Sequence, residues 1–158
     1  MNTKIGLGQD SHAFETKDGK PLIIGGIVFE HHKGLKGNSD ADVLLHSLTN
    51  AISSITGKNI IGAVADELCN KGVKDSSEYL KLALKELNDY NINHIAISIE
   101  CLVPKISPYI NQIKNNLAKL TNTSSADIGI TATSGEGLTE FGKGNGIQVL
   151  TIITVSKK

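Results

Sequence analysis

The segment 39–56, SDADVLLHSLTNAISSIT, most constrains the fold because its apolar residues recur at helical spacing. Ser39, with Asp42 three residues later, has the pattern of a capping box at the start of a helix. Gly57 directly follows the segment and is typical of a helix end. We therefore predict a helix over 39–56 whose buried stripe consists of Leu44, Leu45, Leu48, Ala51, Ile52 and Ile55.

The rest of the chain alternates predicted strands and helices. Helical spacing predicts a helix over 76–87, and the pair Ser107-Pro108 opens another that ends near residue 120. The pattern lacks a dinucleotide-binding fingerprint and predicts an α/β (α+β) fold, a two-layer sandwich of a mixed sheet with helices on one face. The predicted strands lie at 3–8, 22–29, 94–101, 128–133 and 147–155.

Composition limits the class of protein. The 158 residues fit one domain over 1–158, and 39% hydrophobic residues suffice for a core. Lys+Arg and Asp+Glu both number 16, and this balance argues against a nucleic-acid partner. Cys69 and Cys101 match neither a disulfide framework nor a zinc ribbon, which favours a reducing compartment. The amino terminus does not read as a signal peptide and no apolar run is long enough for a membrane, so we expect a cytoplasmic protein.

Three residues form a candidate metal site. Asp10 and His12, at the end of a predicted strand, point to the same face and could hold one cation. His46 interrupts the apolar helix, and Asp42 at i−4 could fix its tautomer. Two histidines and one carboxylate make a catalytic zinc set with an open fourth position, although manganese, cobalt and iron also suit them. The structural alternatives are a polar strand end, a half-buried core histidine and a helix cap.

Two further segments suit phosphate. Asn38 and Ser39 lie at the predicted helix start, where free N–H groups and the helix dipole attract an anion. Their alternative role is ordinary capping.

The glycine-dense loop SGEGLTEFGKGNG is the second of these segments. The small residues of 133–135 let the backbone approach phosphate oxygens, as anion nests do. Glu136 could hold a hard cation such as magnesium, and Lys143 could add positive charge. The alternative is a long surface hairpin, and for Val103-Pro104-Lys105 it is a proline turn with a solvated lysine.

Taken together, these motifs resemble the 2-C-methyl-D-erythritol 2,4-cyclodiphosphate synthase family of the non-mevalonate isoprenoid pathway. The likeness covers nearly the whole chain. It implies a homotrimer with active sites between subunits that converts 4-diphosphocytidyl-2-C-methyl-D-erythritol 2-phosphate into the cyclic diphosphate and CMP. The segments that carry it are GLGQDSHAF (6–14), IIGGI (23–27), NSDADVLLHSLTNAI (38–52), IGAVAD (61–66), VPKISPYI (103–110) and TATSGEGLTEFGKGNGI (131–147).

The resemblance also implies roles for single residues. Zinc, or another divalent transition metal, would be held once per subunit by Asp10, His12 and His46. Magnesium or manganese would arrive with the substrate at Glu136, which, with Thr133 and Ser134, would form the catalytic set. The implied substrate contacts are Asn38, Ser39, Ile61, Gly62, Asp66, Pro104, Lys105, Ile106, Thr133, Ser134, Gly135 and Lys143.

The sequence departs from the family pattern at several of these positions. Asn38 stands where the family usually has histidine, and Ile60 replaces an acidic substrate contact. Lys143 replaces a usual arginine, and Asn145 a frequent glutamate. Two alternatives therefore stay open: a metal-dependent phosphoester hydrolase with an altered substrate, and a non-catalytic ligand-binding trimer.

Overall fold

A four-stranded mixed sheet forms the centre of the computed structural model, which describes residues 2–158 apart from the side chain of His31. The strand order is β1-β6-β4-β5. β4 and β5 are parallel, whereas β6 runs antiparallel to both of its neighbours. The strands are β1 (Thr3–Ala13), β4 (Tyr90–Glu100), β5 (Ile128–Thr133) and β6 (Gly146–Lys157).

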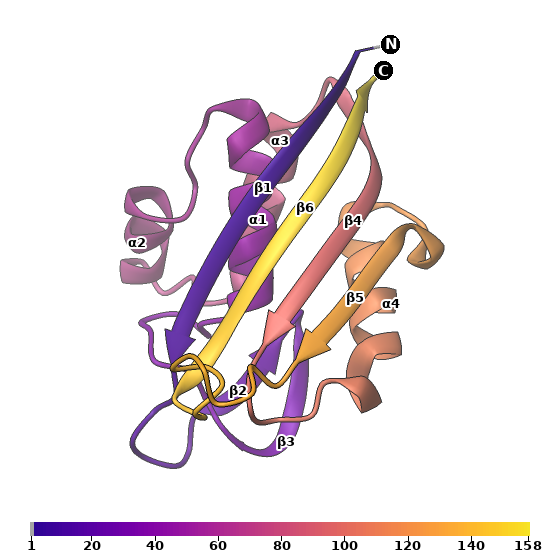
Figure 1. Ribbon diagram of the computed structural model, residues 1–158. Helices are drawn as coiled ribbons and strands as arrows, with labels where there is room; N and C mark the ends of the chain where they lie inside the picture. The colour runs from indigo at the N-terminus through magenta and orange to yellow at the C-terminus, as the bar shows by residue number, and fades with distance from the viewer. Residues whose placement is uncertain (1) are drawn as a thin grey trace.

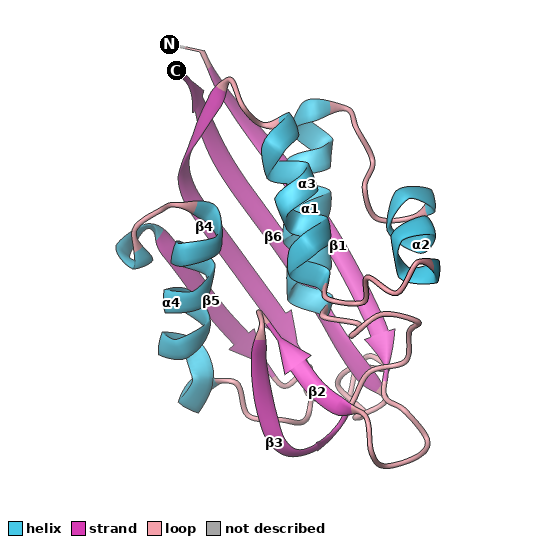
Figure 2. Cartoon of the chain, turned by 180° about the vertical axis from the view of Figure 1, so that it is seen from behind, coloured by secondary structure: helices cyan, strands magenta, loops and turns pink. Residues whose placement is uncertain are grey.

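The main helices cover one face of this sheet, as Figures 1 and 2 show for α1, α3 and α4. The predicted combination of a mixed sheet and helices is thus confirmed. The opposite face stays open and apolar: Leu7 is 58% exposed, Leu150 40% and Ile152 45%. The helices are α1 (Val43–Thr56), α2 (Ala63–Asn70), α3 (Ser76–Glu86) and α4 (Ile110–Thr121), with 3₁₀ turns at Ser107–Tyr109 and Ser125–Asp127.

The single strand predicted over 22–29 is wrong, because this region is a hairpin of β2 (Pro21–Ile24) and β3 (Ile27–Lys33) that forms its own sheet. The turn consists of Gly25 and Gly26, with φ angles of 62° and 77°. Such angles are open to glycine at little cost, so the pair reverses the chain. Their N–H groups donate to the two carboxylate oxygens of Asp42, at 2.9 and 2.7 Å.

The start of α1 also differs from the prediction. The helix begins at Val43, and its N-cap is Asp42, which accepts from Leu45 N at 3.0 Å. Ala41, at φ 55°, is not helical, so the capping box expected at Ser39 does not form. Burial raises the pKa of the Asp42 carboxyl to about 6 against the effect of its N–H donors. The predicted end is confirmed, since Gly57 is a left-handed C-cap.

The bounds of the other helices and strands differ less from the predicted ones. α3 lies within the predicted 76–87, while β4 begins at Tyr90 rather than His94. The segment predicted to open a helix at Ser107-Pro108 is a 3₁₀ turn, and the α-helix starts at Ile110. α2 was not predicted, because it buries only Ala65 and Cys69 and so lacks an apolar stripe.

Two glycines on β1 let α1 lie directly against the strand. A Cβ at Gly8 would lie 2.0 Å from Ser47 O, and one at Gly6 would lie 2.3 Å from Ala51 O. Any larger residue would therefore push the helix away from the strand. This contact brings the His46 side chain of α1 against the end of β1.

Cys69 and Cys101 are both buried and free. In the described part of the chain, none of the helices combines the length and the apolar character needed to cross a bilayer.

Candidate active site

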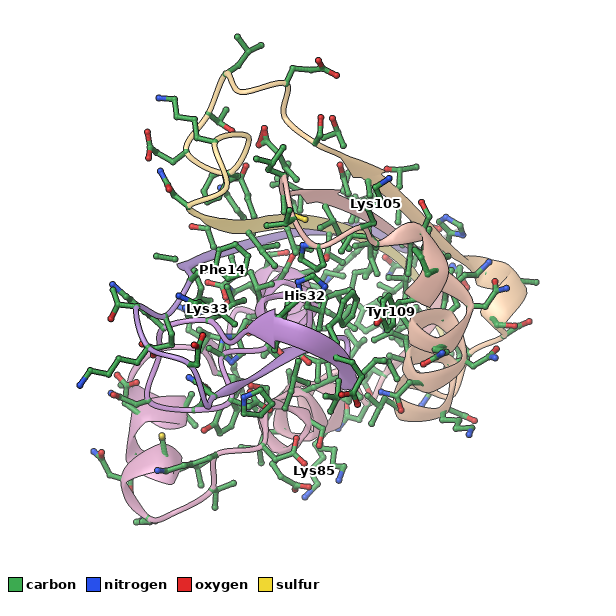
Figure 3. All side chains as sticks on the ribbon, turned by 90° about the horizontal axis from the view of Figure 1, so that it is seen from below. Phe14, His32, Lys33, Lys85, Lys105 and Tyr109 are labelled. Carbon is green, nitrogen blue, oxygen red and sulfur yellow. The ribbon has the colours of Figure 1, made fainter. Side chains whose placement is uncertain are left out.

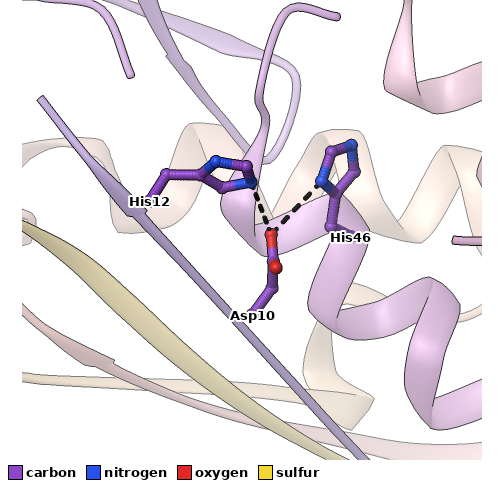
Figure 4. A group of neighbouring side chains, drawn as sticks. All are labelled: Asp10, His12 and His46. Carbon is purple, nitrogen blue, oxygen red and sulfur yellow. Dashed lines mark hydrogen bonds and ion pairs between the residues drawn. The ribbon is translucent and has the colours of Figure 1, made fainter. Parts of the chain in front are cut away.

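The three predicted metal ligands meet at the end of β1 (Figure 4). The Asp10 carboxylate lies 2.9 Å from His12 Nε2 and 3.2 Å from His46 Nδ1, through the same oxygen. One ligand atom from each residue lies within 4.8 Å of the others. The strand contributes Asp10 and His12 with i, i+2 spacing, as the sequence indicated, and α1 contributes His46.

Each imidazole is oriented by a hydrogen bond at the ring nitrogen that does not face Asp10. His12 Nδ1 lies 2.7 Å from Lys36 O, an acceptor, so Nδ1 carries a proton and Nε2 is the nitrogen left to face Asp10 or a cation bound beside it. His46 Nε2 lies 2.7 Å from Ser76 Oγ, which leaves Nδ1 toward Asp10. The prediction that Asp42 fixes the tautomer of His46 is wrong, because that carboxylate caps α1 and receives the glycine turn.

The two imidazoles stabilise the ionised form of the Asp10 carboxyl. Burial alone would raise the pKa of Asp10, but contacts with His12 and His46 outweigh it and hold the pKa below its usual value. The contact with Asp10 raises the pKa of His12 against the opposing effect of burial. A carboxylate that attracts two imidazoles in this way also suits a cation bound between them.

The donor set fits a divalent transition metal. Two imidazole nitrogens and one carboxylate oxygen leave a fourth position for another ligand. His12 Nε2 is buried and, among the described side chains, lacks a well-formed hydrogen bond despite its closeness to Asp10. A buried nitrogen of this kind is costly unless it has a ligand, which supports a metal site.

A cavity of about 300 Å³ opens beside the three ligands. Its lining includes all five of the expected substrate contacts between residues 38 and 66. Ser39 was predicted to lie at the start of the helix, but α1 begins four residues later, at Val43. The Ser39 Oγ instead accepts from Ala41 N at 3.1 Å. Ile60, in contrast, is buried in the core with 7% exposure. The cavity is lined by Asp10, His12, Gly37, Asn38, Ser39, His46, Ile61, Gly62, Ala65, Asp66, Cys69 and Tyr79.

The remaining predicted contacts form a second group, which comprises the segment 101–106 and the loop 133–143. Backbone hydrogen bonds join the two segments: Cys101 N donates to Thr133 O at 3.1 Å and Leu102 N to Phe141 O at 3.0 Å. Lys105, labelled in Figure 3, is exposed, whereas Pro104 and Ile106 are buried. Thr133, Ser134, Glu136 and Lys143 are exposed.

The loop 133–143 is folded tightly at its base. A Cβ at Gly135 would lie 2.7 Å from a Glu100 carboxylate oxygen and 2.8 Å from Gly142 Cα. Thr139 Oγ1 donates to the same carboxylate oxygen at 2.9 Å. The glycine-dense loop is therefore tightly packed at its base, against the side chain of Glu100 at the end of β4.

Glu140 and Phe141 of the loop line a pocket with His12, but the side chain on which the loop packs faces away from the metal ligands. Asp10 pairs with Val149, which is buried beneath the helices, whereas Glu100 pairs with Gln148, the next residue along β6. Adjacent residues of a strand point to opposite faces, so the metal ligands and the Glu100 side chain lie on opposite faces of the sheet. β1 is also separated from β4 and β5 by two and three strand positions, or about 10–14 Å.

Sequence reasoning missed two residues next to the ligands, Asp40 and Ser76. Ser76 is fully buried at the start of α3 and contacts both His46 and Asp40. Asp40 lies in the quoted segment 38–52, but the contact bridges 36 residues and local spacing does not reveal it.

Fold and site together define a mixed α/β protein that carries a two-histidine, one-carboxylate candidate cation site beside a cavity. The model of the YgbB family matches residues 3–156, and the chain belongs to this family. The resemblance stated from the sequence is thereby confirmed.

Relatives agree with this assignment. The 2-C-methyl-D-erythritol 2,4-cyclodiphosphate synthase of Chlamydia caviae is 44% identical over 157 residues, which span 98% of this chain and 89% of the relative. The bifunctional IspDF from Campylobacter jejuni is structurally similar, with a TM-score of 0.89 and 28% identity over 99% of this chain and 43% of that one. IspF of Plasmodium falciparum, in a complex with CDP, gives a TM-score of 0.86 and 25% identity over 99% and 97% of the two chains.

Proposed function

We propose that the protein is a 2-C-methyl-D-erythritol 2,4-cyclodiphosphate synthase, an enzyme that converts 4-diphosphocytidyl-2-C-methyl-D-erythritol 2-phosphate into the cyclic diphosphate and CMP. The observation that carries this proposal is the meeting of Asp10, His12 and His46 beside a cavity in a member of the YgbB family. The relatives named for this activity support it. The cytoplasmic location stays a prediction.

The reaction needs positioning more than a protein nucleophile. An oxygen of the substrate's 2-phosphate attacks the β-phosphorus, a new P–O bond forms, and the bond to the oxygen that leaves with CMP breaks. The protein must hold these atoms in line and balance the charge. A divalent cation at the three ligands, zinc or a similar metal, and magnesium or manganese at Glu136 would supply Lewis-acid stabilisation of the phosphate oxygens.

We assign the residues of the cavity to the methylerythritol phosphate end of the substrate. Ser39 offers a hydroxyl, and Gly62, which lines the cavity, is the N-cap of α2 and leaves the first N–H groups of that helix without a side-chain partner. The other contacts on this end would be Asn38, Ile61 and Asp66.

The second group would bind the cytidine diphosphate end. The segment 101–106, with Pro104, Lys105 and Ile106, would receive the nucleoside, and its hydrogen bonds to the loop keep the two binding segments adjacent. The exposed groups of the loop would contact the diphosphate. These are Thr133, Ser134, Glu136 and Lys143, together with the backbone of the half-buried Gly135.

A complete site would then require two copies of the chain. The Glu100 side chain on which the loop packs faces away from the metal ligands, which favours a substrate that takes the two groups from different copies. The open face also exposes Leu7, Leu150 and Ile152, which a further copy would cover. Both observations support the expected homotrimer with active sites at subunit interfaces.

The test is an assay of the purified protein with the cytidyl substrate and magnesium, read by CMP release and phosphorus NMR. We expect a cyclic diphosphate as the product and loss of bound zinc and of CMP release together in His46→Ala. An open-chain phosphate would instead identify the hydrolase, the alternative that Asn38 and Ile60 suggest. Metal binding without any CMP release would refute the synthase and indicate a ligand-binding protein.

A further inference from the structure

A polar chain of three groups extends inward from the metal ligands. His46 Nε2 lies 2.7 Å from Ser76 Oγ, and Ser76 Oγ is in short contact with one carboxylate oxygen of Asp40. The other oxygen of Asp40 accepts from Ser76 N at 3.0 Å. The serine is fully buried, so water does not compete for these bonds.

The carboxylate at the end of the chain sets the direction of every proton in it. An ionised carboxylate only accepts, so the Ser76 hydroxyl must donate to Asp40. The serine oxygen is then left to accept, and its partner is the Nε2–H of His46. A proton on Nε2 leaves the lone pair on Nδ1, the nitrogen that faces Asp10.

We propose that Ser76 and Asp40 are positioning residues that fix His46 in the tautomer able to bind the cation through Nδ1. The proposal rests on the metal site of the proposed function. His12 obtains the same result from the carbonyl of Lys36, so the two histidines present different ring nitrogens. Groups that orient metal-bound histidines in this way commonly raise affinity for the metal.

The same chain ties the start of α3 to the segment before α1. Asp40 N donates to Lys74 O at 2.9 Å, and Asp42 N donates to the Asp40 carboxylate at 3.1 Å. A merely structural role would therefore change the stability of the metal-free protein. A positioning role would change affinity for zinc, and the two can be measured separately.

The test measures zinc affinity by competition with a chromogenic chelator, alongside thermal unfolding of the metal-free protein. Ser76→Ala should weaken zinc binding about 10- to 100-fold, the range typical of such supporting residues. Ser77→Ala is the matched control, because Ser77 is the next residue on α3 and its side chain does not belong to the hydrogen bonds that join His46, Ser76 and Asp40. Its zinc affinity should equal that of the wild type.

Asp40→Asn is the second variant, since its amide oxygen can still accept from Ser76 N. Its NH₂ would then donate to the Ser76 hydroxyl, which would donate to His46 and move the ring proton to Nδ1. We expect a loss of zinc affinity at least as large as in Ser76→Ala. Metal-free unfolding reports the separate cost of the bond from Asp42 N, because that N–H donates to the same carboxylate oxygen as Ser76 Oγ. The zinc affinity of the double variant should be no lower than that of the single variant with the lower affinity, because both substitutions act through the same series of hydrogen bonds.

Zinc affinities within about twofold of the wild type in both variants would overturn the inference, given the 10-fold minimum expected. An equal loss in Ser77→Ala would overturn it as well, because the effect would then belong to the helix. If the wild type itself did not bind zinc, the metal site of the proposed function would fail with it. If Ser76→Ala does not fold without metal, Asp40→Asn decides.

Discussion

The two groups of predicted site residues are built in opposite ways. Asp10, His12 and His46 lie on a strand and a helix that pack closely, and their side chains are at most 21% exposed. The loop 133–143 presents exposed side chains on a backbone held by glycine contacts at its base. The first group is complete within one chain, whereas the second has a shaped backbone whose functional groups point into solvent.

This difference indicates where each group obtains its function. Packing and the hydrogen bonds to Lys36 O and Ser76 Oγ set the distances among the candidate metal ligands, so this group is ready before any partner arrives. The loop needs a ligand or a second copy to give its side chains partners. The predictions below separate the two groups by testing what each variant loses and what it keeps.

The largest expected effect comes from mixing two inactive variants. His46→Ala should lose zinc and activity, while Glu136→Ala should keep zinc and lose activity, each to about 1% of the wild type or less. If each site combines the metal group of one copy with the loop of another, randomly mixed trimers contain intact sites. About a quarter of the sites would then carry both native residues, and CMP release should return to about that fraction.

The control mixes each variant with more of itself under the same dissociation and reassembly steps, and it should remain inactive. The doubly substituted chain mixed with wild type adds a second check, because it contributes no native group to any site. Failure of the single variants to complement each other would contradict the division of the site between copies. Both groups would then have to serve one substrate within one chain.

The sequence predicted the local part of this arrangement well. The i, i+2 spacing on a strand and the position of His46 in a helix suggested the three ligands, and the resemblance to the family placed them in one site. The sequence could not show that Gly6 and Gly8 bring that helix against the strand, or that Ser76 supports His46 from 30 residues away. These depend on contacts between distant segments, and their spacing follows neither helical nor strand periodicity.

The boundaries of α1 illustrate the same limit. Ser39 and Asp42 both fit a capping pattern, and local sequence alone does not decide between them. The glycine turn of the β2–β3 hairpin decides it, because its two N–H groups hold the Asp42 carboxylate at the cap position. The cap is thus selected by a segment 16 to 17 residues away.

Gly8→Ala tests whether packing holds the metal group together. The new methyl group would lie 2.0 Å from Ser47 O, so the helix must shift, at a cost near the upper end of about 1–3 kcal/mol. For a chain of this size that corresponds to a lower Tm by roughly 6–12 °C. Because the shift also moves His46 away from Asp10, zinc affinity should fall together with stability.

Gly129→Ala is the matched control, since a Cβ there would meet only His94 Nε2, at 3.9 Å. It makes the same substitution on β5, but on the open face that a further copy would cover, so only its zinc affinity is compared, and this should stay near the wild-type value. A Gly8→Ala protein with unchanged zinc binding would show that the ligands do not depend on this contact between helix and strand.

The smallest effect is expected at Lys143, in the loop. Its ammonium lies 3.2 Å from Glu140 Oε1, and both side chains are exposed, so the pair contributes little to folding, on the order of 0–1 kcal/mol. Lys143→Ala should therefore leave Tm and zinc affinity unchanged. Loss of one positive charge facing a diphosphate should raise KM about three- to tenfold, and Lys143→Arg should restore it.

Lys81→Ala controls for the loss of an exposed ion pair, because Lys81 pairs with Glu78 at the same i, i+3 spacing on α3. Neither variant should change unfolding, and only Lys143→Ala should change KM. Equal KM values in the two variants would remove Lys143 from the substrate site. A fall in zinc affinity in Lys143→Ala would show that the loop and the metal group are coupled.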